Sequence, residues 1–168
     1  GKFVRELSAE ISSKGHDCMV VTVETNHPKM NGFIHKNFSQ TPGFPDKFGF
    51  SFALFFFLWR IIKKDQSVIL HIHGLWMWQN IIPLFLPKCS YIYSPHGSIS
   101  NYTFSQLGFW KKIYWHTIQK IVLKNASALH VTSTLEREWL IENGVNHNNI
   151  LVLRLGMLMP RVDVVDTP

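Results

Sequence analysis

The sequence predicts an α/β domain built on a parallel sheet with helices on both faces. Short apolar runs rich in β-branched residues alternate with longer amphipathic runs, and no hairpin-type turn joins one apolar run to the next. This alternation is typical of parallel strands joined by crossover helices. With 168 residues, of which 46% are hydrophobic and 17% charged, the chain can bury one core and does not have a disordered composition.

The first predicted element is a helix over residues 1–15. Gly15 suits its C-terminal end, and its apolar residues recur on one face: Phe3, Val4, Leu7 and Ile11. A buried strand is expected over 17–23, and then a mostly irregular stretch over 24–47 with a short strand near 33–35. A doubly wound domain normally opens with a strand and a Gly-rich turn. Neither precedes this helix, so we expect the chain to be truncated at that turn.

The remaining elements alternate regularly. Strands are expected over 67–72, 90–94, 128–132 and 150–153, and helices over 50–64, 78–86, 110–124 and 134–143, the second of these strained by Pro83. The last eight residues belong to no clear element. We therefore expect one domain over 1–160, and a tail or the start of a crossover to a further domain over 161–168.

Charge and composition narrow the classes of partner. Lys and Arg (17) outnumber Asp and Glu (11), and the net charge of +6 favours an anionic partner such as nucleic acid, a phosphorylated ligand or an acidic membrane surface. Cys18 and Cys89 form neither a disulfide framework nor a metal-type spacing, which fits a reducing cytoplasm. The apolar run 48–62 is shorter than the roughly 20 residues of a spanning helix and contains Arg60, so we expect a buried or interfacial helix.

Residues that could carry chemistry follow three of the predicted strands. In parallel α/β sheets, ligands bind beyond the carboxyl ends of the strands, so these residues should lie along one edge. They are His73, Gly74 and Trp76 after one strand, His96 and Gly97 after the next, and Ser133 after a third.

The histidines raise the question of a metal site. His71 and His73 point to the same side of a strand, and with His96 they could bind zinc. No cysteine or carboxylate follows these strands as a further ligand, and His71 lies deeper in its strand, as a hydrogen-bonded core histidine would. The sequence therefore favours a site without metal.

The Pro95-His96-Gly97 sequence is the strongest candidate for a ligand-contacting site. Gly97 permits a positive φ or a close approach of a ligand, and His96 would project from a stiff strand end with a ring able to donate or accept a hydrogen bond. A turn with an incidental histidine explains the pattern equally well. Ser133 and Glu136 form a capping-box pattern, for which a structural role is favoured, with Glu136 bonding the Ser133 N–H.

The predicted helix over 110–124 is amphipathic. Lys112, His116, Lys120 and Lys124 recur every four residues, and an apolar stripe expected to face the core lies opposite: Trp110, Ile113, Tyr114, Ile118 and Ile121. The cationic stripe is either a solvated face or a contact for phosphate, on a ligand or a membrane surface. Nucleic acid is not expected, because no nucleic-acid-binding signature accompanies the charge.

Five motifs in register carry a resemblance to a known family. They are "GHDCMVVT" (15–22), "HIHGLW" (71–76), "SPHGSIS" (94–100), "KKIYW" (111–115) and "ALHVTSTLE" (128–136). In order and spacing they resemble the N-terminal domain of glycosyltransferase family 4, most of all its bacterial surface-polysaccharide members. The resemblance implies the GT-B fold, in which two Rossmann-like domains face each other across a cleft. It also implies retaining transfer without a metal or other cofactor.

The resemblance also assigns roles to residues. His96 corresponds to the family's cleft-facing histidine near the transferred sugar, and contacts to sugar or acceptor fall on His73, Gly74, Trp76, Gly97 and Ser98. Trp76 is either a stacking surface for a sugar or a plug behind its turn. Gly1 is all that remains of the loop that holds donor phosphates, and Lys112, Lys120 and Lys124 are candidate contacts for membrane or phosphate.

The resemblance implies a function as well. We expect part of an enzyme that moves a sugar from a nucleotide-sugar donor to a lipid-linked glycan of lipopolysaccharide, capsule or exopolysaccharide, in the cytoplasm or at the inner face of the membrane. The expected donor-binding domain is missing, and of the usual Pro-Asn-Gly near the crossover only Gly156 remains, so the chain alone should be inactive. A sugar-nucleotide epimerase of the same fold and a non-catalytic module that binds glycan or anionic membrane are the alternatives.

Overall fold

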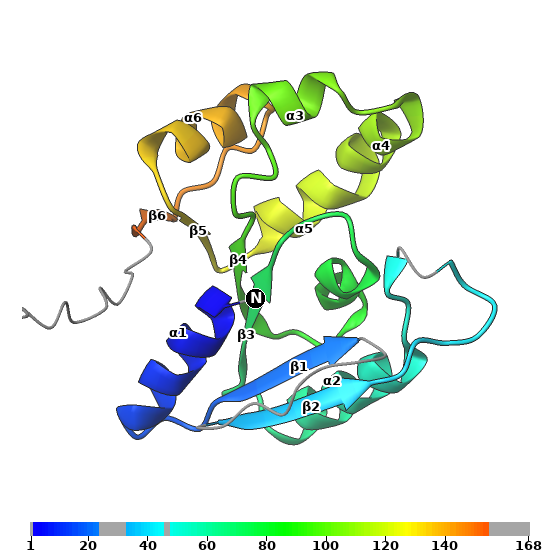
Figure 1. Cartoon of the computed structure of the whole chain (residues 1–168), viewed down its shortest axis with the longest axis vertical. Coiled ribbons are helices and arrows are strands. Elements are labelled where there is room, and N and C mark those ends of the chain that lie inside the picture. The colour runs from blue at the N-terminus through cyan, green and yellow to red at the C-terminus, as the bar shows by residue number, and fades with distance from the viewer. Residues whose placement is uncertain (1, 24–32, 46–47, 155–168) are drawn as a thin grey trace, which may run out of the picture.

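The computed structural model describes residues 2–23, 33–45 and 48–154 and has an α/β architecture in which the paired strands are parallel (Figure 1). Strands β1 (Met19–Val23) and β2 (Ile34–Phe38) form one two-stranded sheet. Strands β3 (Ile69–His73), β4 (Ser90–Ser94), β5 (Ala128–Val131) and β6 (Ile150–Val152) form a second sheet in that order. The predicted fold class is confirmed, and the strand predictions agree with the structure to within two residues at each end except at 33–35, where β2 runs on to Phe38.

The strands form two sheets rather than the single one that a doubly wound domain would have. In the common doubly wound order, the strand that precedes the first helix stands between the two groups of strands seen here. The described residues contain no such strand, because α1 (Lys2–Ser13) is their first element. β1 and β3 therefore each have a hydrogen-bonded partner on one side, β2 and β4 respectively.

The two faces of the four-stranded sheet differ in chemistry because side chains alternate along each strand. One face is apolar and packs into the main core: Leu70, Ile72, Tyr91, Tyr93, Leu129 and Val131. The helices that complete this core contribute Trp115, Val122, Leu123 and Leu140. The alternate positions place His71 and His73 of β3, Ser94 of β4 and His130 of β5 on the opposite face, which is where the candidate site forms.

A long helical segment covers the apolar face. It consists of α4 (Phe109–Tyr114), the π-helical η4 (Trp115–Gln119) and α5 (Lys120–Asn125). The predicted core stripe is wrong in part: Trp110, Ile113 and Ile121 are exposed, and the buried residues are Trp115, Gln119, Val122 and Leu123. Apolar residues occur around the whole helix, so its pattern alone does not fix the buried face. The π turn shifts the side-chain phase between α4 and α5.

The predicted helix over 78–86 is replaced by two short 3₁₀ turns, η2 (Trp78–Asn80) and η3 (Ile82–Phe85). Pro83 has no N–H to donate, and its ring would clash with the preceding turn of an α-helix. A further short helix, α3 (Asn101–Ser105), was not predicted and is capped by Ser100, whose hydroxyl oxygen accepts the Thr103 N–H at 3.0 Å.

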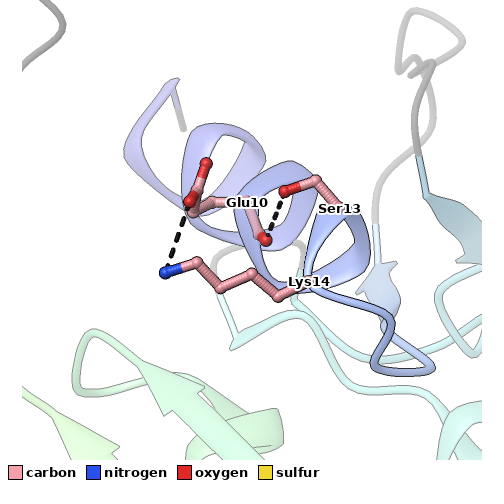
Figure 2. A network of polar contacts seen from close by, with 3 residues as sticks. All are labelled: Glu10, Ser13 and Lys14. Atoms are coloured by element: carbon pink, nitrogen blue, oxygen red, sulfur yellow. Dashed lines mark hydrogen bonds and ion pairs between the residues drawn. The ribbon is translucent and has the colours of Figure 1, made fainter.

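Helix α1 ends as its sequence predicts. The Gly15 N–H donates to Ser12 and the His16 N–H to Ile11, with Gly15 at φ 85°, which together make a Schellman motif. Figure 2 shows the last turn, where the Ser13 hydroxyl donates to the Glu10 carbonyl at 2.8 Å and the exposed Lys14 ammonium lies 3.4 Å from the Glu10 carboxylate. An exposed ion pair of this kind stabilises the helix little.

The other helices complete the frame. Helix α2 (Phe52–Lys64) is capped by Ser51, and Leu54 on its inner face packs with Val23 and Ile82. Helix α6 (Thr134–Glu142) follows β5 directly. The predictions for Gly1, Gly156 and the tail 161–168 lie outside the described residues. Across the described ranges, no helix combines the length and apolar character needed to cross a bilayer.

Candidate functional site

The carboxyl ends of β3 and β4 bring two of the predicted site residues together. His73 Nδ1 lies 2.8 Å from His96 Nε2, and the two rings stack nearly parallel, with centroids 5.1 Å apart. The ring of Phe3 on α1 packs in a T-shaped arrangement with both imidazoles, with its centroid 6.2 Å from that of His73 and 5.5 Å from that of His96. One nitrogen of the pair donates and the other accepts, which leaves His96 Nδ1 available for a ligand.

The surroundings keep these imidazoles neutral. Burial lowers the pKa of His73 to about 3, with further lowering by the His71 and His96 imidazoles. Burial also lowers the pKa of His71 to about 4, with smaller contributions from His130 and His96. The pKa of His96 is lowered by burial as well, although the Glu136 carboxylate acts in the opposite direction. At neutral pH the site therefore presents uncharged rings.

Behind this pair, a second chain of hydrogen bonds runs across three strands. His71 Nε2 lies 2.7 Å from Ser94 Oγ, Ser94 Oγ lies 2.9 Å from His130 Nδ1, and His130 Nε2 lies 3.0 Å from the Leu153 carbonyl oxygen. The carbonyl can only accept, so His130 Nε2 donates. In a neutral His130, Nδ1 then accepts from the Ser94 hydroxyl, and Ser94 accepts from His71. His71 is thus a half-buried, hydrogen-bonded residue, which agrees with the structural role that the sequence suggested.

The turn after β4 is strained and is held from outside. His96 has φ 53° and Gly97 has φ 70°, two consecutive residues in the left-handed region. A residue other than glycine in this region costs about 1–3 kcal/mol and persists only where its surroundings enforce it. The Gly97 N–H donates to Glu136 Oε1 at 2.6 Å, so a carboxylate from α6 holds the turn that follows β4.

Glu136 does not bond as the capping-box pattern predicts. Its other oxygen, Oε2, accepts from the Thr132 N–H at 2.8 Å and from the Thr132 hydroxyl at 3.0 Å, one residue earlier than expected. The Ser133 hydroxyl does cap α6, accepting the Glu136 N–H at 3.1 Å. The carboxylate is only 1% exposed. Glu136 bonds the residues that follow β4 and β5, so it holds the turn that contains His96 in addition to lying in the first turn of α6.

The turn after β3 carries the other predicted contacts. Gly74 has φ 81° and Trp76 has φ 74°, and the Gly74 N–H donates to the Ser94 carbonyl at 2.9 Å. The half-buried Trp76 ring packs against helix α4 and η4, with centroids 6.2 Å from Tyr114 and 6.0 Å from Trp115. These contacts fit the plug interpretation, and a stacking role for Trp76 stays a prediction.

Three residues of the site were not identified as candidates from the sequence. Ser94 and His130 occupy the same sheet face as His71, a relation that pairing of the predicted strands could have shown. Asn80 is buried, and its amide group donates to the His73 carbonyl at 3.1 Å and accepts the Met77 N–H at 2.9 Å. A polar residue inside the apolar run "WMWQNII" was the available signal.

The remaining predicted residues lie elsewhere. Ser98 is half-buried in the turn, where its N–H donates to the Pro95 carbonyl. Lys112 and Lys124 are exposed on the long helical segment, whereas Lys120 is half-buried and its amine reaches Gly144 at the end of α6. The cationic stripe is therefore not a uniform surface.

No three His, Cys, Asp or Glu side chains within the described ranges are placed to hold one metal ion. The geometry explains this arrangement. The nitrogens of His73 and His96 bond each other, and those of His71 and His130 bond Ser94, so they do not converge on a common point.

Comparison with known families gives one match for this sequence. The sequence profile of Glycosyltransferase Family 4 matches residues 1–157, which contain the whole histidine cluster. A comparison with curated protein sequences finds no match.

Proposed function

The chain belongs to glycosyltransferase family 4, and from this premise we propose that it forms the acceptor side of a retaining enzyme. The donor is a nucleotide-sugar, and the acceptor is a lipid-linked glycan in the synthesis of lipopolysaccharide, capsule or exopolysaccharide. We further propose that transfer requires no metal ion.

The observation that carries the proposal is the conformation of His96. A strained turn, bonded to Glu136 on one side and to His73 on the other, fixes a neutral imidazole at the carboxyl edge of the sheet. Glycosyl transfer passes through a state with positive charge on the anomeric carbon. A neutral ring can hydrogen-bond a hydroxyl of the transferred sugar without repelling this charge, whereas an imidazolium would oppose it.

The neighbouring residues have supporting roles in this proposal. His73 holds the imidazole of His96, while Gly74, Gly97 and Ser98 line the approach of the acceptor. The leaving nucleoside diphosphate must be stabilised by cations or oriented N–H groups. The family resemblance assigns most of those groups to a second domain, so we expect the 168-residue chain alone to show no detectable turnover.

Sugar binding tests the role of His96. Saturation-transfer NMR with nucleotide-sugars and acceptor oligosaccharides compares the wild-type chain with His96→Ala and with His116→Ala, which removes an exposed histidine. We expect affinity for a sugar ligand to fall about tenfold or more in the first variant, the scale of one lost hydrogen bond, while circular dichroism shows that the variant is folded. Equal affinity in wild type and His96→Ala would refute the assignment.

Transfer itself is assayed separately. Release of nucleoside diphosphate by the chain alone would overturn the expected inactivity. In that event, the anomeric proton coupling of the product would report whether configuration is retained.

A further inference from the structure

The start of α4 presents an apolar surface that the core does not use. Phe109 is 71% exposed and Trp110 78% exposed, their rings lie 5.6 Å apart, and Ile113 is 38% exposed. We call Phe109, Trp110, Ile113 and Lys112 the α4 surface. In Figure 1, α4 lies at the end of the molecule opposite β1 and β2.

Helix geometry makes these residues one patch. Ile113 stands four residues after Phe109 and three after Trp110, so the three apolar side chains share a side of the helix. The exposed Lys112 borders this side next to Phe109, whereas the exposed Lys111 lies on the opposite side of the helix, with its ammonium over the Trp76 ring. Large exposed rings bordered by cations mark a contact surface rather than a solvated face.

The charge around the patch has one sign. Between Asp65 and Glu136 the sequence contains five lysines and neither Asp nor Glu: Lys88, Lys111, Lys112, Lys120 and Lys124. Four of these lysines lie on the long helical segment that carries the patch. A partner for this surface must therefore be both apolar and anionic.

We propose that the α4 surface docks on an anionic lipid bilayer. Phe109 and Trp110 enter the boundary between headgroups and acyl chains, where aromatic rings are favoured, and Lys112 contacts the anionic headgroups. Lys120 takes no part, because its half-buried amine reaches Gly144. A bilayer fits better than a protein partner because the rings are exposed beyond the core. In addition, no Asp or Glu occurs between Asp65 and Glu136 to pair with the lysines.

Docking here places α4 between the bilayer and the candidate site. The Lys111 ammonium lies 5.7 Å from the centre of the Trp76 ring, and Trp76 belongs to the turn that follows His73. A lipid-linked acceptor would reach the sheet edge from this side. That consequence rests on the proposed function, whereas the docking itself does not.

A second helix offers a weaker version of the same pattern. Phe52 and Phe56 are exposed on α2, which ends in Lys63 and Lys64. Asp65 follows these lysines directly, and α2 lies beside β1 and β2, far from α4 in Figure 1. Because α2 is remote from α4, the Phe52→Ser/Phe56→Ser double variant is a matched control for the α4 surface.

Vesicle co-sedimentation of the 168-residue chain tests the proposal. Vesicles of phosphatidylcholine alone are compared with vesicles containing 30 mol% phosphatidylglycerol, a composition chosen for the test, in low and in high salt. We expect binding to the anionic vesicles that weakens in high salt. Phe109→Ser/Trp110→Ser should reduce the partition about tenfold or more, and Lys112→Gln about fivefold, since a lysine near such a surface is worth about fivefold.

The outcomes separate clearly. The α2 double variant should bind as the wild type does, and circular dichroism confirms that each variant is folded. Absence of wild-type binding to anionic vesicles, equal binding to neutral ones, or loss of binding in the α2 variant but not in the α4 variants would overturn the proposal. Sugar binding by His96 is measured without vesicles, so failure of the proposed function shows in a different experiment.

Discussion

Replacing Glu136 by glutamine should loosen the turn that carries His96. The carboxylate accepts three hydrogen bonds, one from Gly97 and two from Thr132, and is 1% exposed. Glutamine has the same shape but only one oxygen, and its amide group is a donor. The least disruptive arrangement keeps the oxygen on Gly97 and turns the amide toward the Thr132 hydroxyl, which can rotate to accept.

The cost follows from what this arrangement leaves unpaired. The Thr132 N–H loses its acceptor, which costs about 1–3 kcal/mol, and the Gly97 bond loses its charge, which costs about 1 kcal/mol. The free energy of unfolding should therefore fall by about 2–4 kcal/mol. For a domain of this size, 1 kcal/mol shifts the melting temperature by about 2–4 °C, so a fall of roughly 5–12 °C is expected.

Thermal and urea unfolding measure the loss, with Glu138→Gln, an exposed position on the same helix, as the control. A separate readout reports on positioning. The Glu136 carboxylate raises the pKa of His96, so Glu136→Gln should lower the pKa of His96 further, as seen in an NMR titration of the ring protons. If the unfolding free energy changes by less than about 0.5 kcal/mol, or the His96 titration does not move, Glu136 does not hold this turn.

Three further predictions concern stability. The pKa of His73 lies at about 3 in the folded state, below an unfolded value of about 6.5. Its contribution is therefore present above pH 6.5 and is lost as pH falls through 6.5 toward 3. His73→Gln should reduce the fall in the free energy of unfolding between pH 7 and pH 5, measured by urea titration, by about 1–2 kcal/mol, whereas the exposed His116→Gln should leave that fall unchanged. Ser94→Ala should lower the free energy of unfolding by about 1–3 kcal/mol, because the ring nitrogens of His71 and His130 lose their shared hydrogen-bond partner. Ser90→Ala, at an exposed position on the same strand, should leave it unchanged. An equal effect of both variants would contradict the role of the hydrogen-bond chain through Ser94. Gly144→Ala should cost about 1 kcal/mol in the same unfolding assay because φ is 77° and the new Cβ would stand 2.7 Å from the Lys120 amine; a stabilised variant would show that neither matters.

The strands of the four-stranded sheet could be predicted from the sequence because each is a short, largely apolar run bounded by glycine, proline or polar residues. Ser90–Ser94 was placed correctly to the residue, and Ile69–His73 to within two residues. The edge where His73 and His96 meet followed from the rule that parallel strands end on one side. The local signals and the tertiary fold agree at these positions, which is why simple pattern reasoning sufficed.

The helix faces could not be predicted in the same way. In the segment Phe109–Asn125, apolar side chains occur on all sides, so the periodicity wrongly predicted that Trp110 and Ile113 face the core. Packing instead selects Trp115, which contacts Trp76 and Phe104, and the π turn moves the following residues with it. The error has a consequence, because the aromatic residues released from the core are the ones that now form the α4 surface.

The position of His96 is a property of three elements rather than of its own strand. β4 ends in a conformation that disfavours a side chain, and the cost is offset by a carboxylate from α6 and a ring nitrogen from β3. Both partners are buried or half-buried, and neither needs to touch a sugar to influence how one binds. Substitutions at Glu136 or His73 should therefore weaken sugar binding through the geometry of His96, whereas substitutions at Ser94 should affect stability first.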